Sequence, residues 1–154
     1  MNLIEIKKVV NYEQNKRLIK RYSALERLIQ DLAKRDIPAE VTESVNREIE
    51  KVNSIETADK TLSKQLRKSI SEILTLVEKK LKLVPKNLYR TRWMAIGMSG
   101  FGVPIGVAFG VSMDNMRLLA IGIGVGMVIG MAIGAGMDKK AAAEGRQLDI
   151  EMSN

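Results

Sequence analysis

Apolar residues recur at helical spacing through the first third of the chain. One stripe, with intervals of four and three residues and charged side chains between them, consists of Leu18, Tyr22, Leu25, Ile29 and Leu32. Such a stripe indicates an amphipathic helix, which we expect over residues 3–35. Pro38 cannot lie inside a helix and restricts the residue before it, so the helix must end ahead of it.

Two further amphipathic helices are predicted, over residues 39–55 and 60–84. The stripe of the first is Val41, Val45, Ile49 and Val52. The stripe of the second is Leu62, Leu66, Ile70, Ile73, Val77 and Leu81. The polar stretch between them offers Thr57 or Asp59 as a helix cap. Short connections between three such helices predict an antiparallel bundle for residues 1–85, or a coiled coil that forms by association.

The pattern changes at Trp93, because from there to Met137 the only charged residues are Asp114 and Arg117. Two predominantly apolar segments, residues 93–113 and 116–137, are 21 and 22 residues long. A helix needs roughly 20 such residues to cross a bilayer. Only Asp114 and Asn115 separate them. The expected structure of residues 93–137 is therefore a two-helix transmembrane hairpin with a tight turn, and the expected fold class of the chain is all-α.

Eleven of the 12 glycines lie between Gly97 and Gly136. Membrane helices associate where small residues let their backbones approach, and GxxxG spacing provides such a line. The candidate helix-packing residues are Gly102, Gly106, Gly110, Gly122, Gly126, Gly130 and Gly134. We expect these two series to pack together within the hairpin. A second face is expected to meet another copy through Gly97, Gly100 and Gly124.

Basic residues are concentrated directly before the apolar region. Residues 60–92 contain 10 basic side chains and two acidic ones, within a net charge of +7. This placement favours anionic lipid headgroups, not nucleic acid, as the partner. The candidate membrane-interface residues are Tyr89, Arg90, Arg92, Trp93, Lys139 and Lys140. We expect residues 86–92 to form a basic linker before the hairpin and residues 138–154 to form a short tail after it. The excess of Lys and Arg on these two sides of the hairpin predicts an inner-membrane protein with both termini in the cytoplasm.

The composition gives no indication of an enzyme active site. The chain has no histidine and no cysteine, which removes His-based nucleophile triads and the common zinc-ligand sets. The stretches GFGVPIG and GIGVG lack the strand, polar helix and spacing of phosphate-binding loops. We therefore expect no enzyme activity, no metal site and no cofactor.

The repeated apolar segments, MSGFGVPIGVAFGVSMDN and IGIGVGMVIGMAIGAGMDKKA, resemble those of small bacterial glycine-zipper membrane proteins over residues 93–145. The resemblance implies membrane insertion and self-association through the glycine face. It implies no particular activity.

Two functions follow from these expectations. In the first, the hairpin anchors a homo-oligomeric scaffold whose cytoplasmic helices recruit a protein partner. In the second, the chain is a pore former, holin-like or membrane-damaging, and the cytoplasmic helices gate it. The spans carry no ring of polar side chains to line a wet pore, which favours the scaffold.

Overall fold

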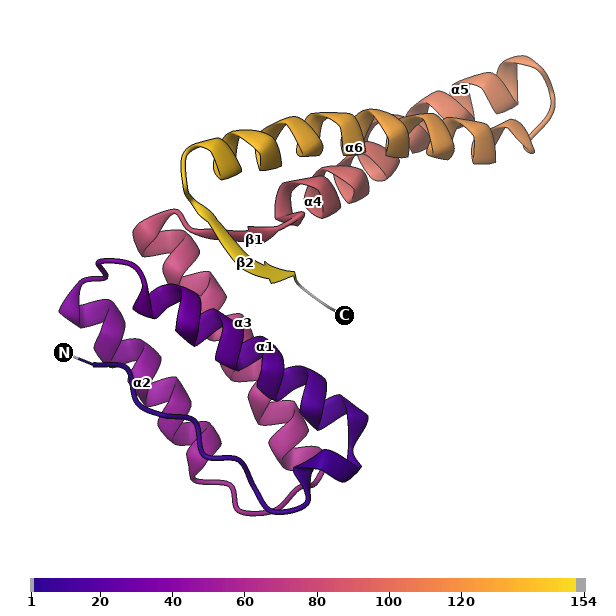
Figure 1. Cartoon of the computed structure of the whole chain (residues 1–154). Coiled ribbons are helices and arrows are strands. Elements are labelled where there is room, and N and C mark those ends of the chain that lie inside the picture. The colour runs from indigo at the N-terminus through magenta and orange to yellow at the C-terminus, as the bar shows by residue number, and fades with distance from the viewer. Residues whose placement is uncertain (1, 152–154) are drawn as a thin grey trace. The chain divides into compact units, whose positions relative to one another are not determined.

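The chain folds into two compact units, seen in a computed structural model that describes residues 2–151 (Figure 1). The first unit holds the residues up to Val84 together with Leu148–Ile150. The second unit holds Pro85–Gln147 and Glu151. The structure is mostly helical, as expected, and two of its helices are long and apolar.

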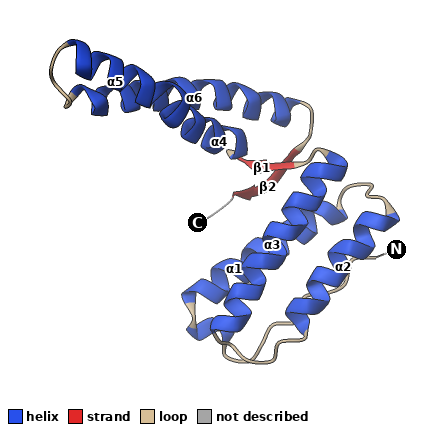
Figure 2. Ribbon diagram, turned by 180° about the vertical axis from the view of Figure 1, so that it is seen from behind, coloured by secondary structure: helices blue, strands red, loops and turns tan. Residues whose placement is uncertain are grey.

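Three amphipathic helices pack around the core of the first unit (Figure 2). They are α1 (Lys16–Ala33), α2 (Ala39–Asn53) and α3 (Lys60–Leu81), preceded by a short 3-10 turn, η1 (Tyr12–Gln14). The side chains that they bury are largely those of the three stripes. The fully buried ones include Leu18, Leu25, Leu32, Val45, Ile49, Leu62, Leu66 and Ile73. This core closes within a single chain.

The first helix does not begin at residue 3, contrary to the sequence expectation. Helix α1 begins at Lys16, where the side chain of Asn15 caps it by accepting a hydrogen bond from the N–H of Arg17 (3.0 Å). Asn11 has a φ of 64°, which no residue of a right-handed helix adopts. The apolar residues before it pack on the core without forming a helical turn: Leu3, Ile4, Ile6 and Val9.

A small sheet replaces part of the expected linker and tail. Helix α3 ends at Leu81, three residues earlier than expected, because Lys82 turns into the left-handed region (φ 58°). Strand β1 (Val84–Lys86) follows and pairs with β2 (Gln147–Glu151). The tail expected over 138–154 therefore contains the end of a helix and a strand, and the fold is not purely α. Leu148 and Ile150 of β2 contribute to the core of the first unit.

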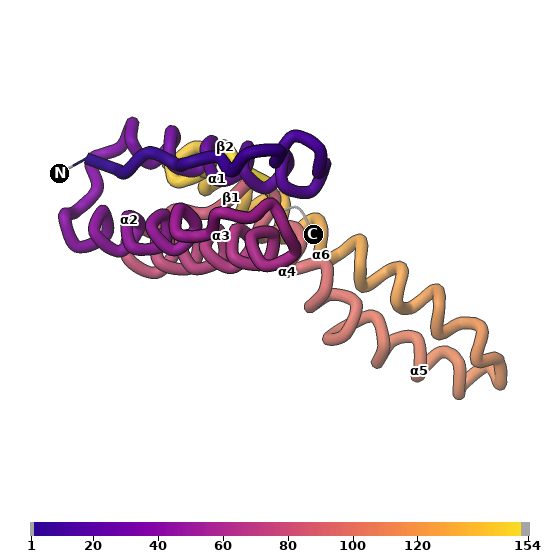
Figure 3. Tube along the Cα trace, turned by 90° about the horizontal axis from the view of Figure 1, so that it is seen from below, coloured from indigo at the N-terminus to yellow at the C-terminus, as the bar shows by residue number. Residues whose placement is uncertain are grey.

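Two long apolar helices form the second unit and lie side by side as a hairpin (Figure 3). One runs without a break over Leu88–Ser112 as α4 (Leu88–Ile96), a π-helical segment, η2 (Gly97–Gly102), and α5 (Val103–Ser112). The other is α6 (Leu118–Ala143). Residues 88–92 are thus helical, so most of the expected basic linker belongs to the first long helix.

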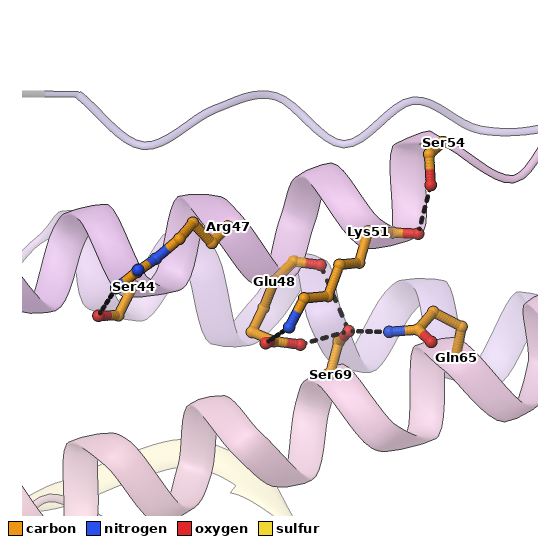
Figure 4. Close-up of polar contacts among 7 residues, drawn as sticks. All are labelled: Ser44, Arg47, Glu48, Lys51, Ser54, Gln65 and Ser69. Atoms are coloured by element: carbon orange, nitrogen blue, oxygen red, sulfur yellow. Dashed lines mark hydrogen bonds and ion pairs between the residues drawn. The ribbon is translucent and has the colours of Figure 1, made fainter.

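A buried hydroxyl joins α2 to α3 (Figure 4). Ser69 is fully buried, and its Oγ lies 2.9 Å from Oε2 of Glu48 and accepts a hydrogen bond from Nε2 of Gln65 (3.0 Å). Lys51 pairs with the same carboxylate from the solvent side. Because a buried polar group without a partner is costly, this set of contacts fixes how α2 packs on α3.

Candidate functional site

Four glycines of α6 lie directly against the backbone of the helix Leu88–Ser112: Gly122, Gly126, Gly130 and Gly134. A Cβ atom built on Gly126 would overlap the carbonyl oxygen of Gly97, and one on Gly130 would overlap that of Trp93. On Gly134 it would lie 2.5 Å from the Cα of Arg90. Main-chain atoms have little freedom to move aside, so any larger residue here must push the helices apart.

The partner helix presents its own glycines to α6. A Cβ on Gly102 would lie 2.8 Å from the Cα of Ile123, and one on Gly106 would lie 2.7 Å from the carbonyl oxygen of Leu119. The contact at Gly110 is less tight, since the atom nearest to a Cβ built there is Sδ of the Met116 side chain, at 3.2 Å. The structure therefore brings all seven candidate packing glycines to one contact within the chain, including Gly122, whose Cβ would overlap backbone atoms of Gly106.

Gly97 belongs to this contact, and the expectation that it faces away is wrong. It is buried, and its Cβ would overlap the carbonyl oxygen of Gly126. The reason is the π-helical segment Gly97–Gly102. A π-helix closes its hydrogen bonds over five residues instead of four, which brings Gly97 onto the same face as Gly102. Pro104, which cannot donate a backbone hydrogen bond, is the second residue after this segment.

Two other glycines do face away from the contact. Nothing lies within 4 Å of a Cβ built on Gly124, and the nearest atom to one on Gly100 is Cγ2 of Ile96, within its own helix, at 4.0 Å. Both agree with their expected orientation. Helices of the hairpin therefore have a glycine-lined contact inside and a few open glycines outside.

Asp138 closes the open end of the hairpin. It is 7% exposed, and its carboxylate accepts hydrogen bonds from the N–H groups of Tyr89 (3.2 Å) and Arg90 (2.9 Å). Those groups stand at the start of α4, where Asn87 (φ 59°) provides no side-chain cap. The carboxylate of one long helix thus caps the other. The sequence contains a signal for this position, because Asp138 lies four residues after Gly134 and so continues the series of packing glycines on the same face of α6.

The expected interface residues gather at this same end. Tyr89, Arg90 and Arg92 lie in α4, close to the last turns of α6, which contain Lys139 and Lys140. Arg92, Lys139 and Lys140 are exposed. Trp93 is half-buried against α6, where its carbonyl oxygen meets Gly130. The hairpin therefore carries a group of cations at the end where the chain enters and leaves it.

Within residues 2–151, no group of three or more acidic side chains is placed to hold a metal ion. Comparison with known proteins gives no match to a family, to a curated protein or to a solved structure.

Proposed function

We propose that the chain is an integral membrane protein whose hairpin spans the bilayer and holds the first unit at the membrane surface. One observation carries the proposal. Both long helices are long and apolar enough to cross a membrane, yet only 22% of the most apolar window of each is buried within the chain. The core helix of a water-soluble protein buries most of such a window, because exposed apolar area is unfavourable in water.

The exposed apolar side chains support the same proposal. Among the residues that the structure describes, all of the exposed large hydrophobic ones except Val10 and Ile19 lie between Ile96 and Met137. They surround a contact made mostly of glycine. The hairpin therefore has small residues between its helices and large apolar residues on its outer surface. Lipid tails suit such a surface, and close backbone packing suits helices in lipid.

The cations support the orientation. Since Asp138 and Gly134 bring the start of α4 to the end of α6, Arg90, Arg92, Lys139 and Lys140 share one end of the hairpin. The positive-inside rule then places this end, and both chain termini, on the cytoplasmic side. Anionic headgroups there add about 1 kcal/mol of attraction for each nearby basic side chain.

The proposed role is a membrane-anchored scaffold, in which the first unit is available to a cytoplasmic protein partner. The glycine series packs within one hairpin. Hairpins of different copies would therefore associate in the membrane by the outer face that contains Gly100 and Gly124. A pore would have to be lined by that same apolar outer face, and for this reason the scaffold is preferred.

Membrane retention tests the proposal. Val107 and Ile129 are 40% and 42% exposed on the two long helices, and a lysine at the centre of a spanning helix costs roughly 2.5–3.5 kcal/mol. The double variant Val107→Lys, Ile129→Lys is expected to leave the membrane fraction on alkaline washing. Ile19→Lys, at a comparably exposed apolar position in α1 (38%), is the matched control and should remain bound. Equal retention of the wild type and the double variant would refute the anchor.

Leakage from anionic liposomes separates the scaffold from the pore. We expect vesicles that contain the reconstituted protein to retain a trapped dye at all protein concentrations. Release that rises with concentration and is abolished by Gly126→Leu would instead favour the pore former.

A further inference from the structure

Residues 2–9, called the strap below, lie along α2 in an extended conformation, as the indigo segment beside α2 in Figure 1 shows. Asn46 holds the strap by its main chain. Its Nδ2 donates a hydrogen bond to the carbonyl oxygen of Asn2 (3.2 Å), and its Oδ1 accepts one from the N–H of Ile4 (3.0 Å). Asn46 is itself buried, so its carboxamide depends on these partners.

Asn53 repeats the arrangement two helical turns later. Its Nδ2 donates to the carbonyl oxygen of Glu5 (3.0 Å), and its Oδ1 accepts from the N–H of Lys7 (2.9 Å). In both cases one carboxamide pairs with the carbonyl of one residue and the N–H two residues later, as a residue of a parallel strand does. Seven residues of α2 rise about 10.5 Å, and three residues of extended chain span about 10 Å, so the two ladders match.

The strap also fits the first unit by its side chains. Its four apolar residues, Leu3, Ile4, Ile6 and Val9, are partly buried and pack against the core. Main-chain hydrogen bonds combined with apolar side-chain contacts are the means by which many proteins bind extended peptides. The first unit thus holds the strap by main-chain hydrogen bonds to Asn46 and Asn53 of α2 and by apolar contacts with the core.

The segment that joins the strap to the rest of the chain has two unfavourable features. Asn11 adopts a φ of 64°, a left-handed conformation that costs most L-residues energy, although Asn tolerates it better than most. Val10, next to it, is 81% exposed although it is apolar. Both features belong to the tight turn that folds the strap back onto its own α2.

We propose that the strap exchanges between two copies of this chain, so that each strap lies along α2 of the other copy and pairs with its Asn46 and Asn53. The exchanged strap makes the same hydrogen bonds and apolar contacts as in one chain, so only the turn at Val10 and Asn11 changes. Opening this turn relieves the left-handed conformation of Asn11. Exchange of an identical element is a low-cost route to a symmetric dimer. The proposal stands apart from membrane insertion, because the strap and α2 both belong to the first unit.

Crosslinking of the full chain in detergent tests the exchange directly. The chain has no cysteine, so introduced cysteines are the only thiols. Copies with Glu5→Cys and copies with Glu50→Cys, which carry different tags, are mixed and treated with a short bismaleimide. Glu5 lies on the strap beside Asn53, and Glu50 is exposed one turn earlier on α2. We expect a product that joins the two tags and increases with concentration.

Glu72→Cys, at an exposed position on α3, replaces Glu50→Cys in the control mixture. Exchange predicts little product there, whereas association through the hairpins alone predicts no preference for position 50 over position 72. Absence of the 5–50 product between copies at all concentrations, or equal amounts of the two products, would overturn the proposal and leave the membrane anchor untouched.

Variants at the turn provide a second measurement. Asn11→Gly adopts a positive φ without strain and is expected to lower the interchain product by roughly three- to tenfold, since two turns change in each dimer. Asn11→Pro, with φ fixed near −65°, excludes the observed turn and should raise the dimeric fraction. An unchanged product in Asn11→Gly together with a monomeric Asn11→Pro would contradict exchange. If Asn11→Pro does not fold, the Asn11→Gly result and the 5–50 product decide the matter.

Discussion

Asp138 accepts a hydrogen bond of 2.9 Å from the backbone N–H of Arg90, 48 residues earlier in the chain. The first N–H groups of a helix have no partner within it, and Asn87 does not supply one by its side chain. The carboxylate therefore pairs with N–H groups that would otherwise lack a partner. Such pairing matters more next to the apolar hairpin, because an unpaired polar group costs more free energy where water is scarce. The same contact also fixes the register between α4 and α6.

Asp138→Ala should loosen the open end of the hairpin. Loss of a capping side chain costs about 0.5–2 kcal/mol, which corresponds to a roughly 2- to 30-fold rise in local opening. We expect hydrogen exchange at the N–H groups of Tyr89 and Arg90, measured in detergent, to accelerate by this factor. Asp138→Asn keeps one acceptor oxygen and should lie between the wild type and Asp138→Ala. Unchanged exchange in both variants would show that the cap contributes nothing.

Replacement of single glycines should separate the inner face of the hairpin from the outer one. Gly126→Ala places a methyl group against the carbonyl oxygen of Gly97, whereas Gly124→Ala meets open space. Gly126→Ala is therefore expected to lower the thermal midpoint of the hairpin in detergent, and Gly126→Leu to lower it further. Gly124→Ala should leave it unchanged or raise it. Equal effects at positions 124 and 126 would contradict the observed packing.

Much of the hairpin could be predicted because its signals are local. Two apolar segments and a two-residue turn define the helices, and spacing by four identifies the glycines that meet. Gly97 could not be assigned in this way. Its position depends on the π-helical segment, which changes the period from four residues to five within a stretch where the sequence gives no sign of the change. Regular helical geometry therefore placed it on the wrong face.

The strap was missed for a different reason. Its apolar residues, among them Leu3 and Ile6, resemble the continuation of the stripe of α1, and no local feature shows that the helix starts only at Lys16. What holds the strap is Asn46 and Asn53, more than 40 residues away. On α2 these look like ordinary polar positions. Long-range pairing between a side chain and a distant main chain leaves no periodic pattern in the sequence.

Asp59 should contribute to the acid sensitivity of the first unit. Its carboxylate accepts hydrogen bonds from the N–H groups of Leu62 (3.0 Å) and Thr61 (2.8 Å), which lower the pKa of Asp59 below its usual 3.8. Since the folded state prefers the ionised form, the stabilisation is complete above pH 4 and is lost as the pH falls through the lowered pKa.

Asp59→Asn keeps the cap without titrating. The thermal midpoint of the variant should therefore fall less than that of the wild type between pH 4 and pH 2, as followed by helical circular dichroism. Parallel curves for the two proteins over this range would exclude a role for Asp59.

Lys82 ends α3 in the left-handed region, with a φ of 58°. Glycine adopts this conformation without the steric cost of a Cβ atom. Lys82→Gly is therefore expected to raise the free energy of unfolding by about 0.5–1 kcal/mol, measured by denaturant titration. Lys82→Ala, which keeps the Cβ atom and removes the charge, is the control. A gain of the same size in Lys82→Ala would mean that conformation is not the cause.

The most direct test of a spanning hairpin is the accessibility of single cysteines to a membrane-impermeant maleimide in cells with an intact inner membrane. Asn115 lies in the turn between α5 and α6, Glu72 in α3, and Glu144 directly after α6. The proposal predicts that Asn115→Cys is labelled from outside the inner membrane, whereas Glu72→Cys and Glu144→Cys are labelled only after lysis. Labelling of all three positions only after lysis, or of all three equally before it, would contradict the proposed topology.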